Sequence, residues 1–351
     1  MKRLAALFLA ALFLLTGCSS QKQEKEQEPV KYEYLCWDVF DTVTTVQGYA
    51  PSQEVWDQAM EVFHDTLLEY HQLYDIYNEY PDLVNLATLN RMAGQGPVEV
   101  DEKIISLLTL SKEVYDLTGG RTNVAAGAVL RLWHDARTLG LEDPEQVALP
   151  DQAALEEGAL HCNMDDLILD SQAGTVELAD PEMSLDVGSI GKGYATEMAA
   201  RAAVEAGVTS AYFNVGGNSR TVGYKPDGSS WAAGLETPWK GDESLPAYLD
   251  ALNISDLSLV VSGDYQRYYT VDGEKYHHLI DLETLYPAQY ASSVAVICAD
   301  SGLADGLSTG LFCMSPEEGL ELVESLEGVE AKWLFPDRTS QESSGWKNYQ
   351  A

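Results

Sequence analysis

The sequence predicts an α+β fold. Helical patterns dominate the first half of the chain, and strand-like patterns dominate the second half. The chain has no internal repeat, and its only long apolar run lies near the N-terminus, over residues 4–15. Segregated helices and strands, rather than alternating ones, are typical of α+β proteins built around a largely antiparallel sheet. Residues 31–351 are numerous enough for one large domain or two lobes, and we expect one domain.

Four helices and one or two strands are expected in the first half. Residues 32–49 are rich in Val, Thr, Tyr and Trp, which favours strands. Ser52 and Asp101 are residue types that cap helix N-termini, and Gly119 and Gly120 are typical of a helix end. The expected helices cover 52–76, 82–93, 101–117 and 123–134.

The second half begins with a predicted hairpin of strands at 167–169 and 175–178. Three helices are expected here, at 195–206, 301–314 and 316–326. Alternating or β-branched runs predict further strands at 210–215, 219–224, 231–236, 257–262, 266–271, 275–280, 292–299 and 331–335. Pro226, Asp227 and Gly228 predict a tight turn between two of these strands.

The N-terminus carries a predicted export signal. Lys2 and Arg3 precede an apolar run over 4–15, which is too short to span a bilayer, and small residues lead to Cys18. This pattern resembles a bacterial lipoprotein signal, so we expect a signal peptide at 1–17 and a lipid on Cys18. The polar residues 18–30 are expected to form a disordered tether that holds the protein to the membrane on its extracytoplasmic side. The alternative is a plain signal peptide with an incidental cysteine.

The chain is strongly acidic. It has 21 Lys and Arg against 56 Asp and Glu, a formal net charge of −35. We therefore expect no nucleic-acid binding, because the phosphate backbone of a nucleic acid binds basic surfaces and this chain is acidic. An acidic protein attracts divalent cations, and an anionic ligand needs a metal or a local cation to bind it well. The cysteines other than Cys18 lack metal-type spacing, and their sequence leaves disulfides and free thiols equally open.

Residues 184–195, S-L-D-V-G-S-I-G-K-G-Y-A, form the first candidate site. Glycines allow close approach of the backbone to a ligand, and the helix predicted next offers unpaired N–H groups to an anion. Asp186 and Lys192 add one charge of each sign. The spacing is not that of a P-loop, and an ordinary structural turn before a helix is the alternative.

Four more clusters follow downstream. They are F-N-V-G-G-N at 213–218, S-G-D-Y-Q-R at 262–267, Y-H-H-L-I-D at 276–281 and L-A-D-G-L-S-T-G-L at 303–311.

In the last of these clusters, Asp305 and Thr309 are four residues apart on one helix face, so their oxygens can converge on a hard cation such as Mg²⁺. Alternatively, Asp305 is a first-turn acid that interacts with the helix dipole, and Thr309 packs inward.

The adjacent histidines His277 and His278 lie in an apparent strand, so their rings are expected on opposite sides. One ring could reach a site while the other faces solvent. A histidine near Asp281 suits a general base or a ligand contact, and a hydrogen-bonded structural histidine is the alternative.

Together the five clusters resemble the FAD:protein FMN transferase family, the ApbE-type lipoproteins. The resemblance runs from about residue 35 to 335, with its main matches at 186–195, 214–218, 261–267, 278–287 and 304–310. Weaker matches occur at 40–42, 89–90 and 119–123.

The resemblance implies an ApbE-like fold and Mg²⁺-dependent transfer of FMN from FAD to a Thr or Ser hydroxyl of an acceptor protein, with release of AMP. FAD is then a substrate, and the acceptor belongs to extracytoplasmic electron-transfer systems. The implied Mg²⁺ ligands are the Ser189 carbonyl, Asp305 and Thr309, and the implied catalytic residues are His278 and Asp305. The implied FAD contacts are Phe40, Tyr77, Arg121, Thr122, Asn123, Asp186, Lys192 and Leu279.

The sequence departs from the family pattern near the flavin. Asp41 replaces a glycine, Thr122 and Asn123 replace a Phe-Asp pair, and Leu282 and Leu285 replace proline and glycine. Leu285 predicts a different turn, because leucine avoids the conformations that glycine allows. These departures keep open the alternative of a non-catalytic FAD-binding lipoprotein. With water as the acceptor, the same site would make the protein an FAD pyrophosphatase, and the acidic, tethered architecture also permits a lipoprotein that binds another solute.

Overall fold

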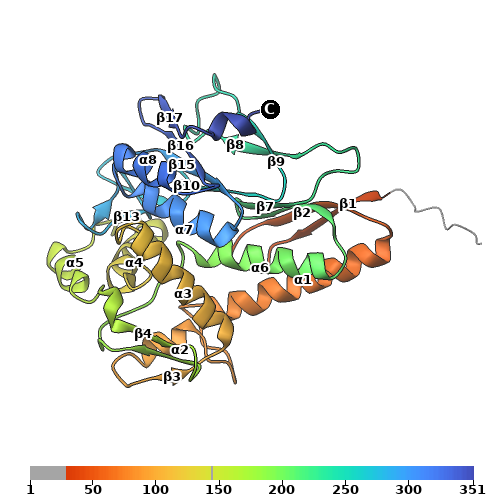
Figure 1. The fold of residues 1–351 in the computed structure, drawn as a ribbon. Coiled ribbons are helices and arrows are strands. Elements are labelled where there is room, and N and C mark those ends of the chain that lie inside the picture. Colours follow the sequence, from red (N-terminus) through yellow and green to blue (C-terminus); the bar gives the residue numbers. More distant parts are fainter. Residues whose placement is uncertain (1–28, 144) are drawn as a thin grey trace, which may run out of the picture.

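The fold is described by a computed structural model for residues 29–143 and 145–351 of the chain. An eight-stranded sheet forms its centre, and every neighbouring pair of strands is antiparallel (Figure 1). In spatial order the strands are β1 (Val30–Cys36), β2 (Thr44–Ala50), β6 (Ser210–Val215), β7 (Asn218–Val222), β10 (Ser258–Gly263), β15 (Ser293–Cys298), β16 (Glu330–Leu334) and β17 (Ser340–Glu342). The predicted α+β class and its antiparallel sheet are confirmed.

Smaller sheets surround the central one. They comprise β3 (Val98–Glu99) with β5 (Thr175–Leu178) and β4 (Leu167–Asp170), β8 (Trp231–Glu236) with β9 (Tyr248–Ile254), β11 (Tyr268–Val271) with β12 (Glu274–His277), and β13 (Ile280–Asp281) with β14 (Tyr286–Pro287). The predicted hairpin is β4–β5, whereas β3, β9, β14 and β17 were not predicted from the sequence. The strand expected at 275–280 is interrupted after His277 by a bend at His278, and strand pairing resumes at Ile280 with β14 in place of β11.

Helices cover one face of the central sheet, chiefly α1, α6 and α7, while the β8–β9 hairpin covers the other face (Figure 1). The helices are α1 (Gln53–Tyr74), α2 (Leu86–Arg91), α3 (Glu102–Leu117), α4 (Gly127–Glu142), α5 (Gln152–Ala159), α6 (Gly191–Glu205), α7 (Ser301–Phe312) and α8 (Pro316–Ser325), with short 3₁₀ helices η1 (Met164–Asp166) and η2 (Trp346–Tyr349). The two predicted N-caps are confirmed. The Ser52 hydroxyl accepts from the Val55 N–H at 3.3 Å, and the Asp101 carboxylate accepts from the Lys103 N–H at 2.8 Å.

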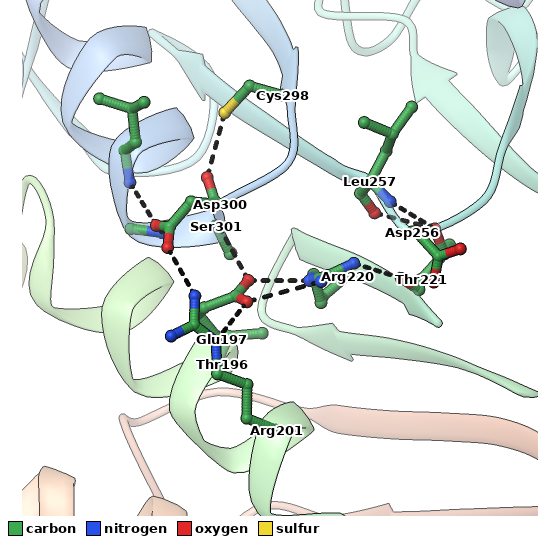
Figure 2. Close-up of polar contacts among 12 residues, drawn as sticks. Thr196, Glu197, Arg201, Arg220, Thr221, Asp256, Leu257, Cys298, Asp300 and Ser301 are labelled. Atoms are coloured by element: carbon green, nitrogen blue, oxygen red, sulfur yellow. Dashed lines mark hydrogen bonds and ion pairs between the residues drawn. The ribbon is translucent and has the colours of Figure 1, made fainter. Parts of the chain in front are cut away.

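A buried glutamate locks α6 to its neighbours (Figure 2). The side chain of Glu197 is only 2% exposed and pairs with Arg220 on β7 at 2.8 Å and with Arg201 at 2.9 Å. Its carboxylate also accepts from the Ser301 N–H at the start of α7, at 3.1 Å. Removing one partner of such a buried pair leaves an uncompensated charge, so Glu197 fixes the relative positions of α6, β7 and α7.

The structure bears on two further properties of the chain, whether it has disulfides and whether it has membrane-spanning helices. The described cysteines, Cys36, Cys162, Cys298 and Cys313, are free thiols, which answers the disulfide question for this part of the chain. In residues 29–143 and 145–351, no helix is both long and apolar enough to cross a bilayer. The predicted signal peptide, most of the tether and Cys18 lie outside the described residues.

Candidate active site

A cavity of about 440 Å³ opens where the C-terminal end of α1, the first turn of α6 and one side each of α4 and α7 meet β10 and the β11–β13 region. This size is within the range of small-molecule sites. The cavity brings together most of the residues predicted from sequence, although they are distributed over some 270 positions. Those that line it are Phe40, Tyr77, Arg121, Asn123, Asp186, Ser189, Lys192, His278, Leu279, Asp305 and Thr309.

The segment before α6 is held in place from two sides. Asn90 binds Leu185 reciprocally, with its amide donating to the carbonyl at 3.0 Å and accepting from the N–H at 2.7 Å. The N–H of Asp186 donates to the Val124 carbonyl at 2.8 Å. The Asp186 carboxylate accepts from the Gly188 N–H at 2.8 Å, and burial raises its pKa. This anchoring presents a half-buried carboxylate at the cavity wall.

Asp305 connects α7 to the first turn of α6. Its Oδ2 accepts from the Gly193 N–H at 2.7 Å, and burial raises its pKa while the charge of Lys192 opposes that rise. The N-cap of α7 is Asp300, so the alternative of Asp305 as a first-turn acid is wrong. Gly193 is required here, because a Cβ at this position would lie 2.5 Å from the Asp305 Cβ and 2.3 Å from the Ser301 carbonyl oxygen.

Lys192 is fully engaged by the protein. Its ammonium donates to the carbonyl oxygens of Val215 and Gly216 at 3.2 and 3.1 Å and to the side-chain oxygen of Asn218. An ammonium has three donors, so none remains for a ligand. Burial lowers the pKa of Lys192 to about 8. Lys192 therefore has no N–H donor left for the predicted contact with a ligand. It can act on a ligand only through its positive charge, which lies close to Asp305.

The two histidines are both accounted for. His277 is 5% exposed, donates from Nε2 to the Ala288 carbonyl at 2.9 Å and accepts from the Leu279 N–H at 3.3 Å, so the expectation that one ring faces solvent is wrong. His278 also lines the cavity, and its Nδ1 lies 3.2 Å from the Arg267 carbonyl. Because a carbonyl oxygen only accepts, Nδ1 carries the proton and Nε2 is the basic nitrogen. Burial and the charge of Arg267 lower the pKa of His278 to about 3.

Basic residues to which the sequence analysis gave no role also face the cavity, although Arg267 ends one of the five sequence clusters. Arg137 and Arg267 both line it, together with His134, whose Nδ1 lies 3.2 Å from Arg137 and 3.4 Å from the Tyr77 hydroxyl. Burial, with the nearby charge of Arg267, lowers the pKa of Arg137. The helix predicted at 123–134 stopped short of Arg137, and only its extension to Glu142 places this arginine on the same element as His134.

The structure modifies the expectations for three residues at or near the predicted FAD contacts. Thr122 does not line the cavity, because its hydroxyl is buried and donates to the Gly306 carbonyl at 2.7 Å, so it ties its loop to α7. Leu285 does not enforce a different turn, since it takes the left-handed φ of +64° that glycine favours. Arg121 is partly neutralised by an ion pair with Glu283 at 2.8 Å.

Asp41 and Leu282, two residues that differ from the family pattern, lie in the site. Both side chains line the cavity, and Asp41 follows Phe40 in a segment where both residues have a positive φ, of +49° and +54°. The carboxylate of Asp41 therefore adds a further acid at the cavity wall.

A large α+β domain whose cavity combines buried carboxylates, histidines and arginines has the architecture of an enzyme. A model of the ApbE family matches residues 40–333, so the chain belongs to that family. The chain is 32% identical over 322 residues to an FAD:protein FMN transferase of Treponema pallidum (strain Nichols), covering 88% of this chain and 85% of that protein. It is 30% identical over 283 residues to an FAD:protein FMN transferase of Klebsiella pneumoniae (strain 342), covering 78% and 84%.

The comparison of folds agrees. The crystal structure of the ApbE protein from Thermotoga maritima MSB8 matches with a TM-score of 0.78 at 26% identity, covering 92% of this chain and 100% of that chain. The family and the ApbE-like fold expected from the sequence clusters are confirmed.

Proposed function

We propose that this protein transfers FMN from FAD to a Thr or Ser hydroxyl of an acceptor protein, releasing AMP. The observation that carries this function is the gathering of Asp186, His278, Asp305 and Thr309 in one cavity of an ApbE-family chain. The name shared by its relatives, FAD:protein FMN transferase, supports the same reaction.

Mg²⁺ is the cofactor that fits the donor set. Carboxylate, hydroxyl and carbonyl oxygens are available from Asp305, Thr309 and Ser189, and all three residues line the cavity. The raised pKa of Asp305 indicates a buried carboxylate that lacks full charge compensation, which a cation would supply. Bound Mg²⁺ would neutralise phosphate charge and make the phosphorus more electrophilic.

The remaining chemistry belongs to this chain's own side chains. Nε2 of His278 accepts the proton of the attacking hydroxyl, since Nδ1 already carries one. The new ester bond forms at the FMN phosphorus as its bond to the AMP oxygen breaks, and AMP leaves with that electron pair. Arg137 and Arg267 provide positive charge in the same cavity, in addition to Arg121 and Lys192, and this charge offsets the field of an acidic protein for the pyrophosphate.

We further propose that the protein is exported and held to the membrane by a lipid on Cys18. The support is the sequence of residues 1–30 alone. Cys18→Ala should move the protein from the membrane fraction to the soluble extracytoplasmic fraction, and unchanged membrane association would contradict the lipid anchor.

The decisive experiment mixes the purified chain with FAD, Mg²⁺ and flavin-acceptor domains. Covalent flavin on the acceptor is read by in-gel fluorescence and AMP by chromatography. Labelling with equimolar AMP supports the transferase. AMP without labelling identifies the pyrophosphatase, and intact FAD bound without either product identifies the non-catalytic binder.

The same assay tests the metal ligand. Asp305→Asn should abolish labelling and Mg²⁺-dependent thermal stabilisation while unfolding stays cooperative, because the amide oxygen can still accept from Gly193. Labelling by Asp305→Asn at the wild-type rate would exclude Asp305 as a Mg²⁺ ligand.

A further inference from the structure

A second cluster of metal-binding side chains lies outside the cavity. Cys36 at the end of β1, Asp38 just after it and His64 on α1 have their ligand atoms all within 4.8 Å of one another. Nε2 of His64 is 3.0 Å from Asp38 Oδ2 and 3.2 Å from Oδ1. None of the three residues lines the active-site cavity, so the proposed transfer reaction does not account for them.

The chemistry of this cluster differs from that of the Mg²⁺ donor set. A thiolate, an imidazole and a carboxylate are the ligand types that zinc prefers, whereas Mg²⁺ prefers oxygen alone. Tetrahedral zinc with ligand bonds of about 2.0–2.3 Å holds its ligand atoms about 3.3–3.8 Å apart. The cluster therefore needs to contract by no more than about 1.5 Å to bind the ion.

Burial and the surrounding charge also suit a metal. Cys36 is 8% exposed, whereas the side chain of Asp38 is 59% exposed, so the cluster is closed on one side and open to solvent on the other. Nδ1 of His64 lies 3.7 Å from Asp65 Oδ1. Zinc-binding histidines commonly donate their other ring N–H to a carboxylate. At 3.7 Å the Asp65 carboxylate is beyond hydrogen-bond distance, so the ring would have to turn slightly on binding the ion to make this contact.

We propose that Cys36, Asp38 and His64 bind Zn²⁺ with a solvent molecule at the fourth position, and that the ion ties residues 36–41 to α1. The thiol gives up its proton on binding, so one proton is released for each ion bound.

This zinc site has a consequence for the cavity. Phe40 and Asp41 follow directly after Asp38 and line the cavity, both with the left-handed φ that residues other than glycine rarely adopt. The Phe40 N–H donates to Nδ1 of His71 at 3.2 Å. His71 lies two helical turns beyond His64 on the same face of α1, so zinc at His64 and this hydrogen bond would hold one segment at two points. The ion therefore has a positioning role for the cavity wall.

Cobalt is the probe for this site, because a Co²⁺–thiolate bond gives an intense near-ultraviolet charge-transfer band. The full chain, freed of metal with a chelator, should bind one Co²⁺ with this band, and Zn²⁺ should displace it while excess Mg²⁺ should not. Cys36→Ser should lose the band, and Asp65→Asn should weaken binding about 10-fold. Cys162→Ser is the matched control, since Cys162 is also a free thiol but lies far from His64 in sequence and outside the cluster.

Zinc binding here is refuted by the absence of a thiolate band, by a band that persists in Cys36→Ser, or by equal loss of the band in Cys162→Ser. If Cys36→Ser does not fold, His64→Gln decides, because His64 is partly exposed and not a core residue. Wild-type cobalt affinity in His64→Gln overturns the site. The readout needs no flavin, so it is independent of the outcome of the transferase assay.

Discussion

At the scale of single residues, His278 differs from the adjacent His277 because one of its ring nitrogens, Nε2, makes no hydrogen bond within the described part of the protein. His277 uses both nitrogens within the protein, whereas His278 has a neutral Nε2 at the cavity. Burial is the larger cause of the low pKa of His278 and the charge of Arg267 is the smaller one, so a bound pyrophosphate would oppose only the part that comes from Arg267.

His278→Gln should therefore lower kcat for flavin transfer by about 10²- to 10⁴-fold, the usual contribution of a general base. FAD affinity, measured by quenching of flavin fluorescence, should change much less. The matched variant is His277→Gln, which removes a structural hydrogen bond and should lower thermal stability more than it lowers kcat. A kcat within tenfold of wild type in His278→Gln would remove this histidine from the mechanism.

Lys192 gives a residue-scale prediction for pH. Its pKa is about 8 in the folded chain and about 10.4 in an unfolded one. Between these values the unfolded state holds more protons, so the free energy of unfolding from this group rises with pH across the window, by about 3 kcal/mol in total. Urea denaturation between about pH 7.5 and pH 9.5 should show a contribution that Lys192→Met abolishes. Lys31→Met, at an exposed lysine, should leave the wild-type slope, and equal slopes in wild type and Lys192→Met would show that burial does not shift this group.

At the scale of elements, the contact between α6 and α7 depends on one missing side chain. Gly193→Ala would drive a Cβ against the Ser301 carbonyl, which is backbone and cannot swing away. We expect a loss of about 1–3 kcal/mol in the free energy of unfolding and weaker binding of Mg²⁺, because Asp305 is displaced with α7.

Gly191→Ala is the matched control for this contact. Its new Cβ would lie 3.1 Å from a methyl group of Val187, which can shift, so it should be nearly neutral by chemical denaturation. If the two alanine variants unfold at the same denaturant concentration, close packing at Gly193 does not hold the two helices.

The elements also show what sequence can and cannot establish. The caps at Ser52 and Asp101 follow from side chain to backbone contacts within three residues, so local pattern was enough. The start of α6 at Gly191, not at Ala195, was missed because glycines disfavour helix locally, while Asp305, 112 positions away, caps the Gly193 N–H. Thr122 was misassigned for the same reason, since its partner Gly306 is 184 positions away.

At the scale of the whole molecule, two electrostatic effects of opposite sign act on FAD. The net charge of −35 repels an anion at long range, while Arg137, Arg267 and Lys192 attract it only inside the cavity. Salt screens distant charges first: the Debye length falls from ~30 Å at about 0.01 M to ~10 Å at about 0.1 M. The repulsion is therefore screened while the contacts within the cavity persist.

The association rate of FAD should consequently rise by about threefold or more as NaCl increases over that range at fixed Mg²⁺. Stopped-flow quenching of flavin fluorescence measures this rate directly. Riboflavin, which lacks phosphate charge, is the control ligand, and its association should respond little to salt. An FAD rate that falls with salt would mean that the cavity arginines steer the ligand from solution and that the acidic surface lies elsewhere on the molecule. In that event Arg137→Gln should reverse the salt dependence, because it removes part of the attracting charge without altering the acidic surface.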